Sequence, residues 1–237
     1  MHTTNYRRFT MSTITVLGGT GYAGSHIVAA AASRGHDVVS VSRSADTIQG
    51  DTAVTYRAVD VTDADALTAV LAGADVVISA LSPRGALAGN LRETDRIVGD
   101  LAAAAGTRLI VVGGFSSLRP APDAPRIIDG GLPKGGDAPF EGADLDALLA
   151  EASEMNSILC DLLARTDDLN WTFASPGLEF GAHVPGEKTG KYRIDTTGVI
   201  LADINGRSAI GGADFADALL DVVDKDLHHR THIAVGY

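Results

Sequence analysis

Apolar runs of strand length recur at regular intervals along most of the chain, at 14–17, 38–41, 54–59, 75–81, 108–113 and 171–175. Helix-prone segments lie between them, at about 22–33, 63–72, 87–105 and 143–166. Strands that alternate with helices need crossover connections, which give a parallel sheet with helices on both faces. The pattern therefore predicts a doubly wound α/β fold.

Two of these runs, 76–80 and 109–113, are continuously apolar rather than alternating. Such runs are typical of central strands that are covered on both faces. In doubly wound sheets, ligands collect at the carboxyl ends of the strands, near the point where the strand order reverses. We therefore expect the site among the residues that directly follow the strands.

After residue 176 the pattern becomes irregular. Short strand candidates lie near 191–194, 198–204 and 207–210, followed by a helix at about 213–223 and a last strand at 231–236. This predicts a small irregular C-terminal substrate lobe. The proline- and glycine-rich segment 119–142 is expected to be a long surface excursion, either as part of a substrate pocket or as a plain connector.

The length of 237 residues suits one α/β domain, which we place at 12–237 after a polar N-terminal extension, 1–11, that we expect to be disordered. This extension lacks the apolar core of a secretory signal. Hydrophobic residues make up 45% of the chain and charged residues 21%, as in soluble globular proteins.

The formal net charge is −11, which disfavours nucleic acid and anionic membrane surfaces as partners and leaves a small-molecule acceptor. The oligomeric state is not determined by these patterns. The single cysteine, Cys160, allows no intramolecular disulfide and suits a reducing compartment, so we expect a cytoplasmic protein. Cys160 itself is predicted to be a buried structural thiol rather than a nucleophile.

A glycine-rich turn follows the first strand, and its spacing can be written as G-x-G-x-x-G (Gly19, Gly21, Gly24) or as G-x-x-G-x-x-G (Gly18, Gly21, Gly24). Glycine permits a pyrophosphate to approach the backbone, and the following helix directs its free N–H groups at the negative charge. Tight turns also use glycine without any ligand. The strand before the turn, the helix after it and a second strand at 38–41 favour a dinucleotide site.

The second strand ends in Ser42-Arg43-Ser44, where NAD-binding proteins usually carry an acidic residue for the ribose 2′-hydroxyl. Arg43 can instead form charge-assisted hydrogen bonds to a 2′-phosphate. The sequence therefore favours NADP(H) over NAD(H), with an ordinary solvated arginine as the alternative. Asp60, after the third strand, is predicted either to contact the adenine or to precede a helix capped by Thr62 or Asp63.

With these motifs, the segments 18–24, 42–43, 59–61, 111–118 and 185–193 make the chain resemble the atypical short-chain dehydrogenase/reductase group. Within this group it is similar to the NmrA-like NAD(P)H-binding proteins, many of which are described as NADH-flavin reductases. The resemblance spans nearly all of 12–237. It implies a Rossmann-type domain that binds NADP(H), with hydride transfer in some members and redox sensing in others.

The resemblance also implies roles for individual residues. The phosphates would lie at Gly19 to Tyr22, the nicotinamide ribose at Ser79 to Leu81, and the nicotinamide beside Ser116 and beneath Pro176 to Leu178. Together with the motifs above, the expected cofactor-binding residues are Gly18, Gly19, Thr20, Gly21, Tyr22, Ala23, Gly24, Ser42, Arg43, Asp60, Val61, Ser79, Ala80, Leu81, Gly113, Pro176 and Gly177.

The chain lacks the Tyr-x-x-x-Lys pair with which most short-chain dehydrogenases move a proton. Four tyrosines are followed four positions later by Thr, His, Asp and Thr, and the fifth is Tyr237. Alcohol dehydrogenation by that route is therefore not expected. In the flavin and biliverdin reductase branch a histidine follows the proline of the sixth strand. This chain has Gly177 there, and the nearest histidine is His183.

Flavins and quinones need little from the protein beyond orientation, because the acceptor takes up the hydride and solvent can supply the proton. Ser116 and Ser117 are candidate hydrogen-bond donors or plain turn residues, and His183 is a candidate proton donor or a loop residue. Lys188, Lys191 and Arg193 either steer an anionic acceptor or belong to a strand edge. No metal site is predicted, since His228, His229 and His232 fall in a loop that leads to an expected edge strand.

The leading hypothesis is an NADP(H)-dependent oxidoreductase that transfers hydride to a planar acceptor such as a flavin or quinone. The alternative is a non-catalytic NAD(P)H-binding redox sensor or regulatory protein. A third interpretation, an epimerase or dehydratase, is disfavoured because those enzymes also use the absent tyrosine.

Overall fold

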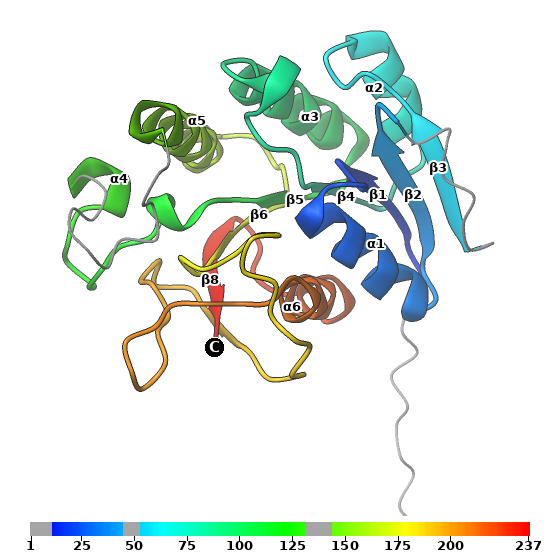
Figure 1. Ribbon diagram of the computed structural model, residues 1–237. Coiled ribbons are helices and arrows are strands. Elements are labelled where there is room, and N and C mark those ends of the chain that lie inside the picture. Colours follow the sequence, from blue (N-terminus) through cyan, green and yellow to red (C-terminus); the bar gives the residue numbers. More distant parts are fainter. Residues whose placement is uncertain (1–10, 45–52, 131–143) are drawn as a thin grey trace, which may run out of the picture.

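A computed structural model describes residues 11–44, 53–130 and 144–237 (Figure 1). Its strands are β1 (Thr13–Leu17), β2 (Asp37–Ser42), β3 (Val54–Ala58), β4 (Val76–Ser79), β5 (Arg108–Val112), β6 (Trp171–Pro176), β7 (Arg193–Asp195) and β8 (Thr231–Gly236). Its α-helices are α1 (Tyr22–Ser33), α2 (Ala64–Leu71), α3 (Leu91–Ala105), α4 (Ile127–Gly130), α5 (Leu145–Ala164) and α6 (Gly212–Asp224). Two 3-10 helices, η2 (Gly85–Leu87) and η3 (Phe115–Ser117), follow β4 and β5.

The strands form one sheet in the order β3-β2-β1-β4-β5-β6-β8-β7. All neighbouring pairs are parallel except β7 and β8, which are antiparallel. The strand order reverses between β1 and β4, so the carboxyl ends of these two strands flank the switch point at which such sheets bind ligands. The predicted Rossmann-type, doubly wound fold is confirmed.

Helices cover both faces of the sheet. α1 and α6 lie side by side on one face, while α2, α3 and α5 lie on the other (Figure 1). Each layer packs its own apolar cluster against the sheet, around Phe215 and Ile27 on the first face and around Trp171 and Leu159 on the second. This two-sided burial explains why the central strands read as continuous apolar runs.

Most predicted elements are present, with ends within a few residues of the expected ones. The strand candidates at 198–204 and 207–210 were wrong, because each of these segments forms only an isolated bridge, Arg119–Val199 or Glu179–Ala209, and no strand. The last strand, β8, was expected at an edge, but it lies between β6 and β7. The described part of the 119–142 excursion contains α4, and the predicted extension 1–11 lies, except for Met11, outside the described residues.

Cys160 was predicted to be buried and is exposed. The inward face of α5 carries Met155, Ile158, Leu159 and Leu162, whose i, i+3, i+4, i+7 spacing leaves position 160 on the opposite side. None of the described helices is long and apolar enough to cross a membrane.

Candidate functional site

A cleft of about 330 Å³ opens at the carboxyl ends of β1 to β4. Its lining comes from the glycine turn, from the ends of β2 and β3, and from the segment that follows β4. The lining residues are Gly18, Thr20, Gly21, Val41, Ser42, Arg43, Ser44, Val59, Asp60, Val61, Thr62, Ala80, Leu81, Ser82, Arg84, Gly85, Ala86 and Leu87.

Three glycines of the turn are required by the turn's own packing. A Cβ at Gly18, where φ is +78°, would lie 2.7 Å from the Ala80 carbonyl oxygen. One at Gly24 would lie 2.1 Å from the Gly18 carbonyl oxygen, and one at Gly19 2.3 Å from Ser40 Oγ. Helix α1 can therefore approach the strands closely, which holds its first turn at the end of the sheet. At these three positions, an added Cβ would clash with atoms of the protein itself.

Gly21 differs from these three glycines, because its nearest contact for an added Cβ is 3.3 Å away and it lines the cleft. It is the N-cap of α1 and makes no side-chain capping hydrogen bond, and the first turn of the helix contains no acidic residue. Among the described α-helices of eight or more residues, every other one has a capping aspartate, an acidic first turn, or both. The positive end of α1 is therefore open toward the cleft, as an anion site requires.

The opposite side of the cleft carries groups that suit a ribose and its phosphate. Ser42 Oγ is buried and has no hydrogen-bond partner. Arg43 is exposed and forms no ion pair with the other described residues, and its Nη2 lies 3.9 Å from the position of a Cβ on Gly85. An orphan hydroxyl beside a free guanidinium provides donors for a phosphorylated ribose. The residues present thus fit the dinucleotide that the glycine motif predicts.

Asp60 also lines the cleft, and its Oδ1 accepts hydrogen bonds from the Thr62 N–H (3.0 Å) and hydroxyl (2.7 Å). These two bonds lower the pKa of the Asp60 carboxyl, with a further contribution from the positive charge of Arg43. The N-cap of α2 is Asp63, which accepts from the N–H groups of Asp65 and Ala66. Asp60 therefore presents a carboxylate to the cleft while the next aspartate caps the helix.

The cleft brings together nine of the predicted cofactor residues: Gly18, Thr20, Gly21, Ser42, Arg43, Asp60, Val61, Ala80 and Leu81. Predicted residues that do not line it are Gly19, Tyr22, Ala23, Gly24, Ser79, Gly113, Pro176 and Gly177. The sequence reasoning missed Arg84 and the η2 segment. The signal available was their position directly after β4, at the same edge of the sheet.

Several of the residues outside the cleft have partners elsewhere. The Tyr22 hydroxyl accepts the Gly212 N–H at 3.0 Å, at the start of α6. Ser79 Oγ donates to the buried carboxylate of Asp95 at 2.7 Å. Burial raises the pKa of Asp95 to about 7, against the opposing effect of the Ser79 hydrogen bond, and Glu154 raises it further. A Cβ on Gly113 would lie 2.0 Å from the Phe173 ring. Tyr22, Ser79 and Gly113 therefore have packing or hydrogen-bonding roles.

The three predicted catalytic candidates do not line the cleft. Ser116 and Ser117 are buried in η3, and Ser117 Oγ has no hydrogen-bond partner. His183 is exposed in the loop after β6, beside Gly181. η3 directly follows β5, at the same edge of the sheet as the cleft.

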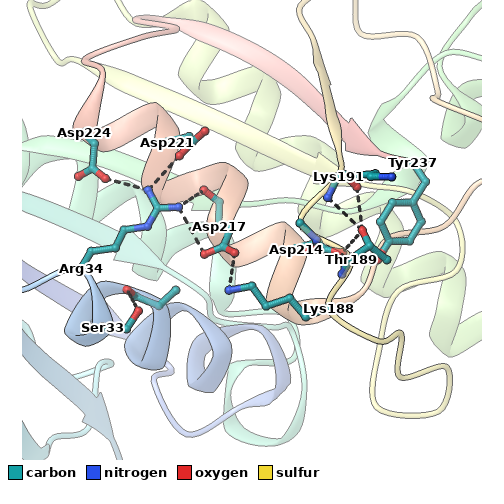
Figure 2. Close-up of polar contacts among 12 residues, drawn as sticks. Ser33, Arg34, Lys188, Thr189, Lys191, Asp214, Asp217, Asp221, Asp224 and Tyr237 are labelled. Atoms are coloured by element: carbon teal, nitrogen blue, oxygen red, sulfur yellow. Dashed lines mark hydrogen bonds and ion pairs between the residues drawn. The ribbon is translucent and has the colours of Figure 1, made fainter. Parts of the chain in front are cut away.

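The cationic segment 185–193 is attached to α6 (Figure 2). The fully buried Asp214 accepts the N–H groups of Thr189 and Gly190 and the hydroxyls of Thr189 and Tyr237. Lys188 pairs with Asp217 at 2.6 Å. Arg193 opens the edge strand β7 and donates to the Ala202 carbonyl. Arg193 thus belongs to a strand edge, as one of the two sequence-based alternatives expected, whereas Lys188 lies outside β7 and pairs with α6.

The described residues contain no group of three or more side chains arranged to hold a metal ion. His232, one of the three C-terminal histidines, lies in β8 and pairs through Nε2 with Ser175 Oγ at 2.9 Å. Burial lowers its pKa to about 4, and the nearby Arg126 and Arg119 add to the effect. The ring is therefore neutral at physiological pH.

Residues 18–226 match a protein family described as NAD(P)H-binding. The chain belongs to this family. Its assignment to the atypical short-chain dehydrogenase/reductase group is thereby confirmed, as is the expectation of a nicotinamide coenzyme.

Relatives of known sequence or structure agree with this assignment. The uncharacterized protein YwnB of Bacillus subtilis (strain 168) is 32% identical over 229 residues, or 94% of this chain and 97% of the relative. A solved structure from Bacteroides thetaiotaomicron, described as a candidate epimerase, has a TM-score of 0.81 and 27% identity, covering 96% of this chain and 98% of that chain. A candidate NADH-flavin reductase from Streptococcus pneumoniae has a TM-score of 0.77 and 29% identity, with 95% and 99% covered.

Proposed function

We propose that this protein is an NADP(H)-dependent oxidoreductase that reduces a planar acceptor such as a flavin or quinone. The observation that carries the proposal is the cleft itself. The uncapped start of α1 lies on one side, and the free guanidinium of Arg43 with the orphan hydroxyl of Ser42 lies on the other. The family supports a nicotinamide coenzyme, and the name of the Streptococcus pneumoniae structure supports reductase activity.

When bound, the coenzyme supplies a hydride to the acceptor. The residues of this chain bind and orient the nucleotide: the amides of Thr20 and Gly21 at the diphosphate, Ser42 and Arg43 at the phosphorylated ribose, and Ala80 and Leu81 beside the adjoining ribose. Ser117, whose hydroxyl has no partner, is the proposed hydrogen-bond donor on the acceptor side. Solvent delivers the proton, which fits the absence of a Tyr-x-x-x-Lys pair from the sequence.

The absence of the Tyr-x-x-x-Lys pair argues against an epimerase, although one structural relative carries that name.

A sensor that binds NADP(H) without turnover is the second candidate. It is favoured by a specific observation, since Ser116, Ser117 and His183 all lie outside the cleft lining. The net charge of −11 supports a small-molecule partner rather than nucleic acid, and the single cysteine supports a cytoplasmic location.

The proposal is tested in two steps. Fluorescence titration with NADPH and NADH measures coenzyme binding, and tighter NADPH binding is the expected result. Steady-state oxidation of NADPH is then followed with FMN, riboflavin and a quinone as acceptors. Turnover with any of them supports the reductase. Coenzyme binding without turnover favours the sensor, and no binding of either coenzyme contradicts both.

A further inference from the structure

A second arginine, Arg84, lines the cleft from the segment between β4 and α3. Its Nε and Nη2 donate to Glu151 of α5 at 3.1 and 2.9 Å, and 72% of its side chain is exposed. The next residue, Gly85, lies beside Arg43, since a Cβ there would be 3.9 Å from Arg43 Nη2. Arg43 and Arg84 therefore line the same cleft from two different segments, and the segment of Arg84 approaches the Arg43 guanidinium at Gly85.

The cleft wall is attached to α5 independently of Arg84. Glu154, one turn after Glu151, accepts the N–H groups of Gly89 (2.9 Å) and Arg92 (3.1 Å) at the start of α3. Arg92 adds a bidentate pair with Asp161 at 2.7 and 2.8 Å. Because these contacts already hold the segment against α5, the Arg84–Glu151 pair is not needed to fix the wall.

A guanidinium has five N–H donors, and the bidentate pair uses two of Arg84's. The Nη1 edge donates to no other described residue, in a side chain that lines an anion-binding cleft. The Arg84–Glu151 pair carries no net charge, so it adds little to the long-range field. Any effect of Arg84 on an anion must come from direct hydrogen bonds, whose direction Glu151 sets by holding the other edge of the guanidinium.

We propose that Arg84, oriented by Glu151, is a second phosphate-binding residue of the coenzyme site and contacts the monophosphate on the adenosine ribose together with Arg43. This inference rests on the proposed function, because it assumes that the cleft binds a phosphorylated dinucleotide. Arg84 is then a specificity-determining residue and Glu151 is a positioning residue. The ligand class is a nucleotide that carries an additional ribose phosphate.

Calorimetric titration with 2′,5′-ADP and 5′-AMP tests the proposal, because these probes differ by that phosphate alone and do not depend on turnover. For Arg84→Ala we expect about tenfold weaker binding of 2′,5′-ADP and at most about threefold weaker binding of 5′-AMP, the range of one or two charge-assisted hydrogen bonds. Arg96→Ala removes a bidentate pair with Glu93 that lies outside the cleft and away from the wall contacts, and it should leave both affinities unchanged.

Glu151→Gln separates ligand contact from wall support. Glutamine retains an oxygen that accepts from Arg84 but removes the negative charge, so 2′,5′-ADP should bind as tightly as to the wild type, or more tightly. Equal losses in Arg84→Ala and Glu151→Gln would show that the pair only supports the wall and would overturn the proposal. Unchanged binding in Arg84→Ala would also overturn it, with the proposed function intact. Failure of the wild type to bind both NADPH and 2′,5′-ADP would refute both.

Discussion

The helices α1 and α6 begin in the same way and end up with opposite surroundings. Each has an extended glycine as its N-cap, Gly21 with φ −74° and ψ 176° and Gly211 with φ −74° and ψ 149°, and neither N-cap glycine can supply a capping side chain. At α6 the Gly211 N–H is bound by the Tyr237 hydroxyl, the Gly212 N–H by the Tyr22 hydroxyl, and Asp214 is buried in the first turn. At α1 the first turn has no such partner and adjoins the cleft.

The difference shows how one local geometry serves two purposes. The orphan N–H groups of a helix start must find acceptors, which can be side chains of the protein or a ligand. α6 takes its acceptors, the hydroxyls of Tyr22 and Tyr237, from distant parts of the chain. Asp214 in its first turn also holds the segment around Thr189 (Figure 2). α1 leaves that position to an anion, which is the physical basis of the proposed coenzyme site.

The largest expected effect comes from removing Asp214, the buried hydrogen-bond acceptor in the first turn of α6. Asp214→Ala leaves the donors of Thr189, Gly190 and Tyr237 without their partner, and we expect the free energy of unfolding to fall by about 4 kcal/mol. Urea denaturation measures the change. Asp65→Ala, which removes an exposed carboxylate from the first turn of α2, is the control and should cost less than about 1 kcal/mol. If Asp214→Ala lowers the free energy of unfolding no more than the control does, the first turn of α6 does not depend on Asp214 as described.

Stability measured as a function of pH distinguishes Asp214 from a second buried aspartate, Asp95. Burial raises the pKa of Asp214, but the hydrogen bonds from Thr189, Gly190 and Tyr237 outweigh it and hold that pKa below the usual value. Its stabilisation is therefore present above about pH 4 and is lost as the pH falls further. Asp95 accepts one hydrogen bond from the described residues, that of Ser79, and burial raises its pKa to about 7. Its contribution to stability is therefore lost as the pH rises from about 4 to about 7.

The expected result for Asp95 is measurable by comparison with Asp95→Asn. From about pH 5 to about pH 8, the unfolding free energy of the wild type should fall by about 2 kcal/mol relative to that of the variant, because the wild type must release a proton from a buried site. Parallel pH profiles for the two proteins would contradict the raised pKa.

At the open helix start, Arg43→Ala tests what the free guanidinium contributes. We expect NADPH affinity to fall by about 2 kcal/mol, or roughly 30-fold, with little change for NADH, because only the 2′-phosphate is affected. Fluorescence titration gives both constants. Arg57→Ala, at an exposed arginine of β3, is the control and should change neither. Equal losses for NADPH and NADH would instead indicate that Arg43 does not distinguish the two coenzymes.

The smallest effect is expected at the contact that joins the two helix starts. Tyr22→Phe keeps the ring packing with Phe180 and His26 but leaves the buried Gly212 N–H without its acceptor. The free energy of unfolding should fall by about 1–2 kcal/mol, while NADPH affinity stays within about threefold of the wild type. Thermal and urea unfolding, with the same titration, measure both quantities. A larger effect on binding than on stability would show that Tyr22 acts in the coenzyme site.

The sequence by itself determined the alternation of strands and helices, the glycine turn and the position of Arg43, because these depend on periodicity and on spacing over a few residues. Only the tertiary structure decided which side chains share a space. In the folded chain, Ser79 hydrogen-bonds Asp95 and Tyr22 hydrogen-bonds Gly212. Cys160 is exposed, and Arg84 lines the cleft. Contacts such as Tyr22–Gly212 join residues 190 positions apart. Local sequence patterns cannot predict such contacts, because the contacts form only when α1 and α6 pack on one face of the sheet.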